Sequence, residues 1–185
     1  MEKLDDSKLE IILTGHEIWL ETNKKEGKRA NLMNLDLRGV CFRSITKEEN
    51  LSEVLLIGSN LNGVDLERFN LENASLSCAN LENTNLDCAN LVHTDLSKAN
   101  LKKADLSNAD LSHANLSHAD LESANLESAN LDYTKLYKTN LQKANIAKRN
   151  KNKRKPGELS CHTTFRGADL TNAIFSKNIT LDYFV

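Results

Sequence analysis

Residues 89–126 read ANLVHTDLSKANLKKADLSNADLSHANLSHADLESANL, with a leucine at every fifth position. The spacing extends from Leu61 to Leu141 and closes on Ile146, which gives eighteen centres in one uninterrupted series. The residue two before each centre is usually small, alanine in eleven cases, and Asn or Asp precedes the centre except at Ser75 and Lys135. The unit A-(N/D)-L-x-x is therefore an internal repeat of five residues.

A period of five fits neither an α-helix nor a straight β-strand. On a helix, successive leucines would lie about 140° apart, because each residue turns about 100°. On a strand, side chains alternate between two faces, so every second leucine would point into water. A corner after each unit removes this conflict, since the small residue and the leucine then point inward together. The pattern predicts a coil with an apolar interior.

In tandem, the unit A-(N/D)-L-x-x resembles the pentapeptide-repeat family. The resemblance implies an all-β solenoid, a right-handed quadrilateral β-helix with four units per turn, in which residue n stacks on residue n+20. Weaker units of the same kind are centred on Leu32, Leu37 and Phe42 and again on Phe165, Leu170 and Phe175.

The whole chain divides around this coil. We expect residues 1–29 to form an N-terminal α-helical cap and residues 30–180 to form the β-helix. Insertions interrupt the coil near 45–53 and at 147–162, where the five-residue spacing fails. Residues 181–185 are expected to form a C-terminal cap or a dimer contact.

The cap helix is expected from about residue 7 to residue 24. Ser7 followed by Glu10 is a capping-box signature, and Gly27 is placed to end the helix. Apolar residues and one histidine recur between them at helical spacing, namely Leu9, Ile12, Leu13, His16 and Leu20. Such a helix would cover the open end of the first coil, as the ends of solenoids require. A helix that binds a partner is the alternative.

Composition supports one domain with an unusual core. The 185 residues are 39% hydrophobic but only 5% aromatic, so many Leu and Ala contacts must supply the core. No run of about 18 apolar residues and no signal-like segment is present, so we expect a cytoplasmic protein without a membrane partner. We also expect it to be bacterial-like.

The sharpest charge feature lies in the second insertion. Six bases follow one another there without an acid: Lys148, Arg149, Lys151, Lys153, Arg154 and Lys155. Removing these six from the 24 Lys and Arg leaves 18 bases against 26 acids. Such a segment is either a solvated loop or a contact site for nucleic acid or an acidic protein surface. We expect no nucleic-acid contact elsewhere.

The C-terminus is apolar for a chain end, because Leu181, Tyr183, Phe184 and Val185 follow one another closely. These residues either fold back over the last coil or meet a second copy of the chain. Some members of the family pair through this end, so the resemblance adds weight to a homodimer.

Catalytic motifs are missing from the sequence. It has no G-x-S-x-G, P-loop, HExxH or Cys-x-x-Cys, so we expect no enzyme activity and no cofactor. In a four-sided coil His93 and His113 stack on one outer face, with Tyr133 on the next turn. Two imidazoles at this spacing can share a metal, but His118 lies round the corner on the adjoining face. With no third ligand, we expect no metal site.

Two functions fit the rod. The first is a non-enzymatic protein-interaction module with an unknown protein partner, as solenoids commonly are. The second is implied by a branch of the family whose rods mimic duplex DNA, bind DNA gyrase or topoisomerase, and inhibit it or protect it from quinolones. Residues 61–146 carry 12 acids and 7 bases and have Leu at the centres where that branch often has Phe, which makes them a poor mimic.

Overall fold

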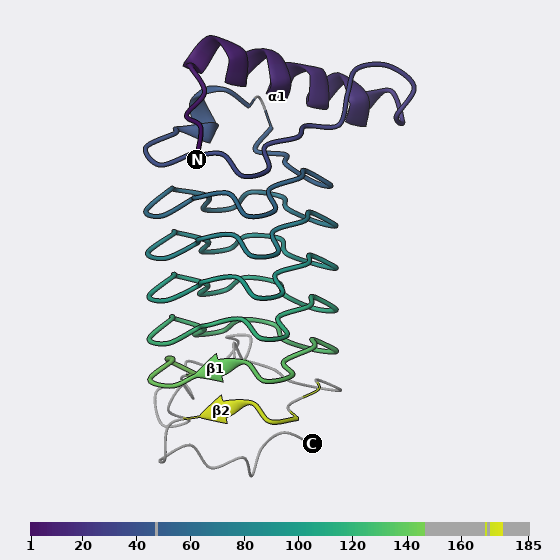
Figure 1. The fold of residues 1–185 in the computed structure, drawn as a ribbon. Coiled ribbons are helices and arrows are strands. Elements are labelled where there is room, and N and C mark those ends of the chain that lie inside the picture. Colours follow the sequence, from purple (N-terminus) through teal and green to yellow (C-terminus); the bar gives the residue numbers. More distant parts are fainter. Residues whose placement is uncertain (47, 147–168, 170, 176–185) are drawn as a thin grey trace, which may run out of the picture.

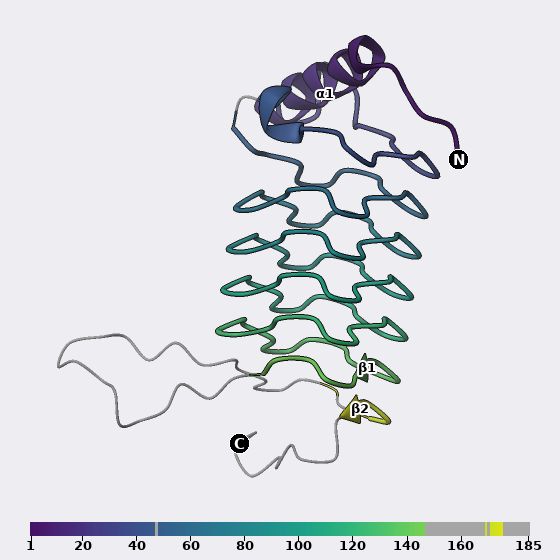
Figure 2. The same cartoon turned by 90° about the vertical axis from the view of Figure 1, so that its left-hand side faces the viewer.

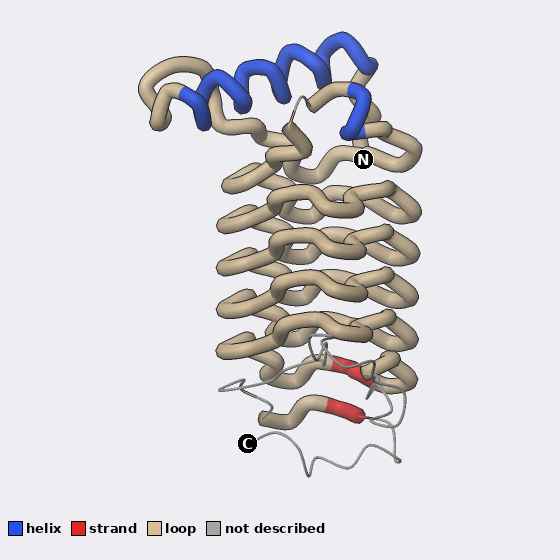
Figure 3. The backbone as a smooth tube through the Cα atoms, turned by 180° about the vertical axis from the view of Figure 1, so that it is seen from behind, coloured by secondary structure: helices blue, strands red, loops and turns tan. Residues whose placement is uncertain are grey.

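The computed structural model describes residues 1–46, 48–146, 169 and 171–175. In this part the chain winds into stacked coils that form a rod, and α1 (Asp6–Glu21) lies across one end (Figure 1). Turned views show the coils in line along the rod (Figures 2 and 3). The other elements are a 3-10 helix, η1 (Phe42–Ser44), and the parallel strands β1 (Asn140–Leu141) and β2 (Ile174–Phe175).

The coil has a period of twenty residues. Parallel bridges join residues twenty apart from Asn50↔Asn70 through Asn125↔Asn145. The leucines point inward and are fully buried, together with the residue two before each of them. The predicted coil of four five-residue sides is therefore confirmed over these residues.

Corners arise because the second residue after each leucine has a positive φ, at every fifth position from Glu53 to Lys143. Across one such turn the Thr94 N–H donates to the Leu91 carbonyl at 3.1 Å. Most L-residues adopt this left-handed conformation at a cost, whereas Asn, Asp and His adopt it more readily. Corner residues such as His93 (φ 58°) are exposed.

Threonine can replace the inward alanine because its hydroxyl finds a partner inside the coil. Thr94 is fully buried, and its Oγ1 donates to the Leu71 carbonyl of the preceding coil at 2.9 Å. Thr84 bonds to Leu61 in the same way at 2.9 Å. These bonds satisfy polar groups that would otherwise be costly to bury.

The residues before the leucines form hydrogen-bonded columns along the sides. Asn80 Oδ1 accepts the Glu82 N–H at 3.2 Å and the Nδ2 of Asn100, on the next coil, at 3.0 Å. A carboxylate can only accept, so an Asp fits this column where an Asn follows it one coil later. In each such pair the Asn Nδ2 donates to the Asp Oδ1 at 2.8 to 3.1 Å. The acceptors are Asp65, Asp95, Asp105, Asp110 and Asp120.

This direction of donation predicts opposite effects for two exchanges. Asp105→Asn should raise the free energy of unfolding by about 0.5–1.5 kcal/mol, because the new amide can donate to Asn85 on the preceding coil. Asn100→Asp should lower it by a similar amount or more, because it loses the bond to Asn80 and places a carboxylate above Asp120. Urea unfolding measures both, and effects of the same sign would contradict the proposed direction.

The two insertions change the pairing offset. Asp36 pairs with Asn60, 24 residues on instead of 20, so the first insertion adds four residues. Pairing resumes at Asn50, within the range near 45–53 where the sequence predicts the insertion, and η1 precedes this range. Lys135 pairs with Asp169, 34 residues on, so the second insertion adds fourteen before the coil resumes.

Helix α1 exists as predicted, but the capping box at Ser7 and Glu10 is wrong. The N-cap is Asp5, whose carboxylate accepts the Lys8 N–H at 2.9 Å, so Ser7 lies inside the helix. Asp is as good an N-cap as Ser, and its negative charge is favoured at a helix N-terminus. The helix ends at Glu21 and not near residue 24.

His16 links α1 to the coil through hydrogen bonds of its ring. The residue is 1% exposed. Its Nδ1 accepts the Ala30 N–H at 3.2 Å, so Nε2 carries the proton and donates to the Ser52 carbonyl at 2.9 Å. At one edge of the first coil, the Asp36 N–H donates to the Glu2 carbonyl at 2.8 Å. The N-terminal segment therefore covers both the interior and part of the strand edge, as a cap should.

Stability should fall as the pH drops from 7 to 5. Burial lowers the pKa of His16 below its ordinary 6.5, so the unfolded chain binds this proton more readily. The loss should approach about 1.4 kcal/mol per pH unit below 6.5 at most. The Arg38 guanidinium lowers the pKa of Asp36 from 3.8 to about 2, so stability that depends on its charge is lost only below pH 3.8. His16→Gln should remove the dependence between pH 7 and 5, and an unchanged dependence would contradict this role for His16.

Candidate partner-binding surface

Three consecutive coils place chemically distinctive side chains on one side of the rod. The side bears four outward columns, each with one residue per coil. We call these twelve positions the His–Tyr face: His93, Asp95, Ser97, Lys98, His113, Asn115, Ser117, His118, Tyr133, Lys135, Tyr137 and Lys138. Among the residues that the structure describes, both tyrosines and all three exposed histidines lie here.

A ring stack forms one edge of this face. The centroids of His93 and His113 are 4.9 Å apart with an interplanar angle of 28°, and those of His113 and Tyr133 are 4.9 Å apart at 10°. The three residues occupy the same corner on successive coils, so their spacing follows the rise of about 4.8 Å between adjacent strands. The predicted column is confirmed, and Tyr133 at its end is 47% exposed.

The opposite edge combines rings with positive charge. The rings of His118 and Tyr137 meet edge to face, with centroids 5.4 Å apart. The ammonium of Lys138 lies 5.1 Å from the centroid of Tyr137, within the range of a cation–π interaction. Lys98 occupies the same corner column as Lys138, two coils earlier.

Charge is distributed unevenly around the rod between residues 61 and 146. The side of the His–Tyr face has three bases, Lys98, Lys135 and Lys138, and one acid, Asp95. The side opposite has one base, Arg68, and five acids: Asp65, Glu67, Asp87, Asp105 and Glu127. The side before the His–Tyr face has three acids and no base: Glu72, Asp110 and Asp132.

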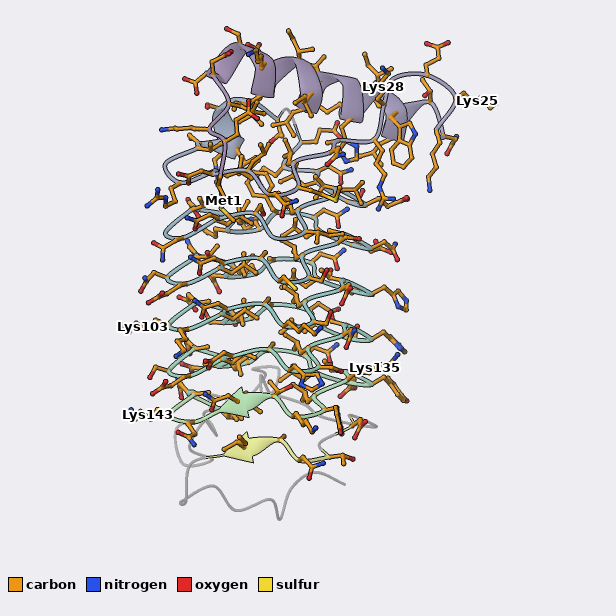
Figure 4. All side chains as sticks on the ribbon, viewed as in Figure 1. Met1, Lys25, Lys28, Lys103, Lys135 and Lys143 are labelled. Atoms are coloured by element: carbon orange, nitrogen blue, oxygen red, sulfur yellow. The ribbon has the colours of Figure 1, made fainter. Side chains whose placement is uncertain are left out.

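On the remaining side of the rod, acids and bases form ion pairs, so its charges balance. Lys102 Nζ lies 3.1 Å from Asp120 Oδ2 and 3.6 Å from Glu122 Oε2, and Lys143 lies 3.0 Å from Glu122. Hydrogen bonding to Lys143, then to Lys102, lowers the pKa of Glu122. Lys103 and Lys143 project on one flank of the rod and Lys135 on the other (Figure 4).

Asp95 is the single acid among the twelve positions of the His–Tyr face, so its charge offsets one of the three lysines. Its Oδ1 accepts the Ser97 N–H and the Nδ2 of Asn115, both at 3.1 Å. The carboxylate thus serves the turn and the side-chain column. The net charge of this side is positive, and it faces away from the most acidic side.

The face offers no metal centre in the part of the chain described. Within these residues no three His, Cys, Asp or Glu side chains come close enough to hold a metal. His93 and His113 stack face to face, and Tyr133 occupies the next position in their column. The arrangement suits contact with a partner through rings and charges.

Two sites predicted from the sequence fall outside the described residues and stay predictions. They are the basic segment, with Lys148, Arg149, Lys151, Lys153, Arg154 and Lys155, and the apolar end, with Leu181, Tyr183, Phe184 and Val185. The five-residue spacing predicts the histidine column but does not by itself group this column with Tyr137 and the three lysines. Sorting outward residues by position modulo twenty would have done so.

Comparison with known proteins agrees with the coil. A family model described as pentapeptide repeats, in eight copies, matches residues 50–87, 74–112 and 109–146. No curated protein matches the chain.

Solved structures with similar folds include QnrB1, described as a plasmid-mediated fluoroquinolone resistance protein. A trypsin-treated variant of QnrB1 has a TM-score of 0.54 and 18% identity, over 77% of this chain and 61% of QnrB1. HetL, from the cyanobacterium Nostoc sp. strain PCC 7120, has 29% identity and a TM-score of 0.38 over 80% of this chain and 58% of HetL. Rfr23, from the cyanobacterium Cyanothece 51142, has 25% identity and a TM-score of 0.44 over 91% of this chain and 99% of Rfr23. The chain thus spans about three fifths of QnrB1 and of HetL, and the match to QnrB1 supports a right-handed quadrilateral β-helix.

Proposed function

Because the chain belongs to the pentapeptide-repeat family, we propose that it is a non-enzymatic protein-interaction module, a rigid rod that presents the His–Tyr face to a partner protein. The observation that carries this proposal is the gathering of exposed rings on one side of three coils. Aromatic residues are enriched in protein interfaces, because they bury a large area with few rotatable bonds. This chain is only 5% aromatic, so the grouping is distinctive.

The coil supports this role by holding the face in a fixed shape. Asn115, in the middle of the face, sits on backbone that is bridged to the coils on either side, at Asp95 and at Lys135. A binding surface that is already ordered loses little conformational freedom on association.

The helices in residues 1–46, 48–146, 169 and 171–175 are too short or too polar to span a membrane.

A pull-down from the native cell with matched variants tests the proposal. The face variant carries His113→Ser, Tyr133→Ser and Tyr137→Ser, because serine occupies equivalent positions at Ser117 and Ser123. The control carries Asn83→Ser, Asp87→Ser and Asn108→Ser, which lie away from this face. We expect the wild type and the control to recover the same partner and the face variant to lose it. Recovery of that partner by a folded face variant would refute the proposal.

Action on DNA gyrase or topoisomerase is the second candidate, and the fold shared with QnrB1 is the observation that favours it. A mimic of duplex DNA needs negative charge around the rod, whereas the acids here concentrate on two sides and the His–Tyr face is positive. A gyrase supercoiling assay with and without quinolone decides between the candidates. Inhibition or protection at micromolar protein would support the second one, and no effect would exclude it.

A further inference from the structure

We propose that the His–Tyr face binds an extended acidic segment of the partner protein, a proposal that rests on the interaction function above. Three lysines face outward on this side against a single acid, Asp95, so the net charge of the side is positive. The two most acidic sides of the rod repel a negative segment. Charge therefore both attracts the segment and selects the side to which it binds.

The columns of the face run along the rod and define the direction of the segment. Ser97, Ser117 and Tyr137 form one column, with the ring stack on one flank and the corner column of Lys98, His118 and Lys138 on the other. Lys98 and Lys138 lie two coils apart, about 9.6 Å at 4.8 Å per coil. A chain in polyproline II conformation repeats every third side chain on one side at about 9.3 Å. Carboxylates three residues apart can therefore reach both lysines from a segment parallel to the rod.

The rings favour a peptide over a nucleic acid. His93, His113 and Tyr133 stack on one another at 4.9 Å, which leaves no space for a base between them. Single-stranded nucleic acids bind to open aromatic platforms, whereas the ring faces inside this stack are already covered by one another. A duplex would also extend beyond this side and meet the acids of the neighbouring one. A narrow acidic segment avoids that repulsion.

Fluorescence anisotropy with a labelled oligoglutamate tests the proposal. A peptide of about twelve glutamates is suitable, because self-repulsion keeps such a chain extended. The lysine variant is K98Q/K135Q/K138Q, and the control is K102Q/K103Q/K143Q on the adjoining side, with the same change in net charge. We expect the wild type to bind the peptide with an affinity that falls with salt. The affinity should be about tenfold lower in the lysine variant and should change less than about twofold in the control.

Each outcome decides a separate point. Equal weakening by both variants would show general charge attraction and overturn the proposal. If an oligothymidylate of the same length binds more tightly than the oligoglutamate, the face is assigned to nucleic acid instead. Failure of the wild type to bind oligoglutamate would exclude an acidic segment but leave the interaction function standing, since the pull-down tests that function independently.

Discussion

Leu101→Lys is expected to unfold the rod. Leu101 is fully buried near the middle of the coil, at a position that no water reaches. The exchange loses about 1.5–3 kcal/mol of leucine burial and adds several kcal/mol for an unpaired ammonium inside the protein. Together these losses amount to a large part of the free energy of unfolding of a domain, which is roughly 5–15 kcal/mol. Circular dichroism during urea unfolding should show a lost or greatly lowered transition.

Lys102→Ala is the control, one residue further along the chain. Lys102 points outward and makes ion pairs with Asp120 and Glu122 at the surface. Exposed pairs contribute about 0–1 kcal/mol each, so the urea midpoint should change little. Equal midpoints for Leu101→Lys and Lys102→Ala would contradict the inward position of the leucines.

Gly27→Ala should detach the cap. Gly27 has a φ of 74°, and a Cβ there would overlap the Gly15 carbonyl oxygen and lie 2.7 Å from the Trp19 nitrogen. Both atoms belong to the backbone of α1, so rotation of a side chain cannot relieve the overlap. The segment around Gly27 and α1 must therefore move apart, which weakens the packing that buries Leu9 and Leu13. Hydrogen exchange of the α1 amides should become much faster, and the thermal midpoint should fall.

Gly63→Ala separates this overlap from backbone strain. Gly63 has a similar φ of 70°, but a Cβ there meets no atom within 4 Å. Its exchange should cost about 1–2 kcal/mol of left-handed strain, offset in part by the lower entropy of the unfolded chain. If the two alanine variants lose the same stability, the close contact between Gly27 and α1 is not what holds the cap.

The repeat could be predicted because one local rule recurs. A period of five excludes both regular elements, and the order small residue, Asn or Asp, Leu defines which side chains point inward. The twenty-residue turn came from the family resemblance, and the bridge from Asn80 to Asn100 confirms it. The column of Asn and Asp side-chain bonds could not be predicted from the repeat alone, because it depends on which residues lie twenty apart.

Features that depend on the choice between two possible N-cap residues, or on tertiary contacts, were harder to predict. Asp5 and Ser7 are both good N-caps, and the choice depends on how the chain enters α1. His16 reads as an ordinary apolar-face position, yet it bonds to Ser52 and Ala30 across the cap. Tyr137 joins the His–Tyr face only when side chains twenty residues apart are compared.

Site-specific photocrosslinking in the native cell shows whether a partner contacts the His–Tyr face. Benzoylphenylalanine is placed at position 117, in the middle of the His–Tyr face, or at position 107, an equivalent half-buried serine on the opposite side. If the His–Tyr face binds a partner protein, we expect one discrete crosslinked partner from position 117 and none from position 107. Crosslinks from position 107 alone, or equally from both, would contradict it.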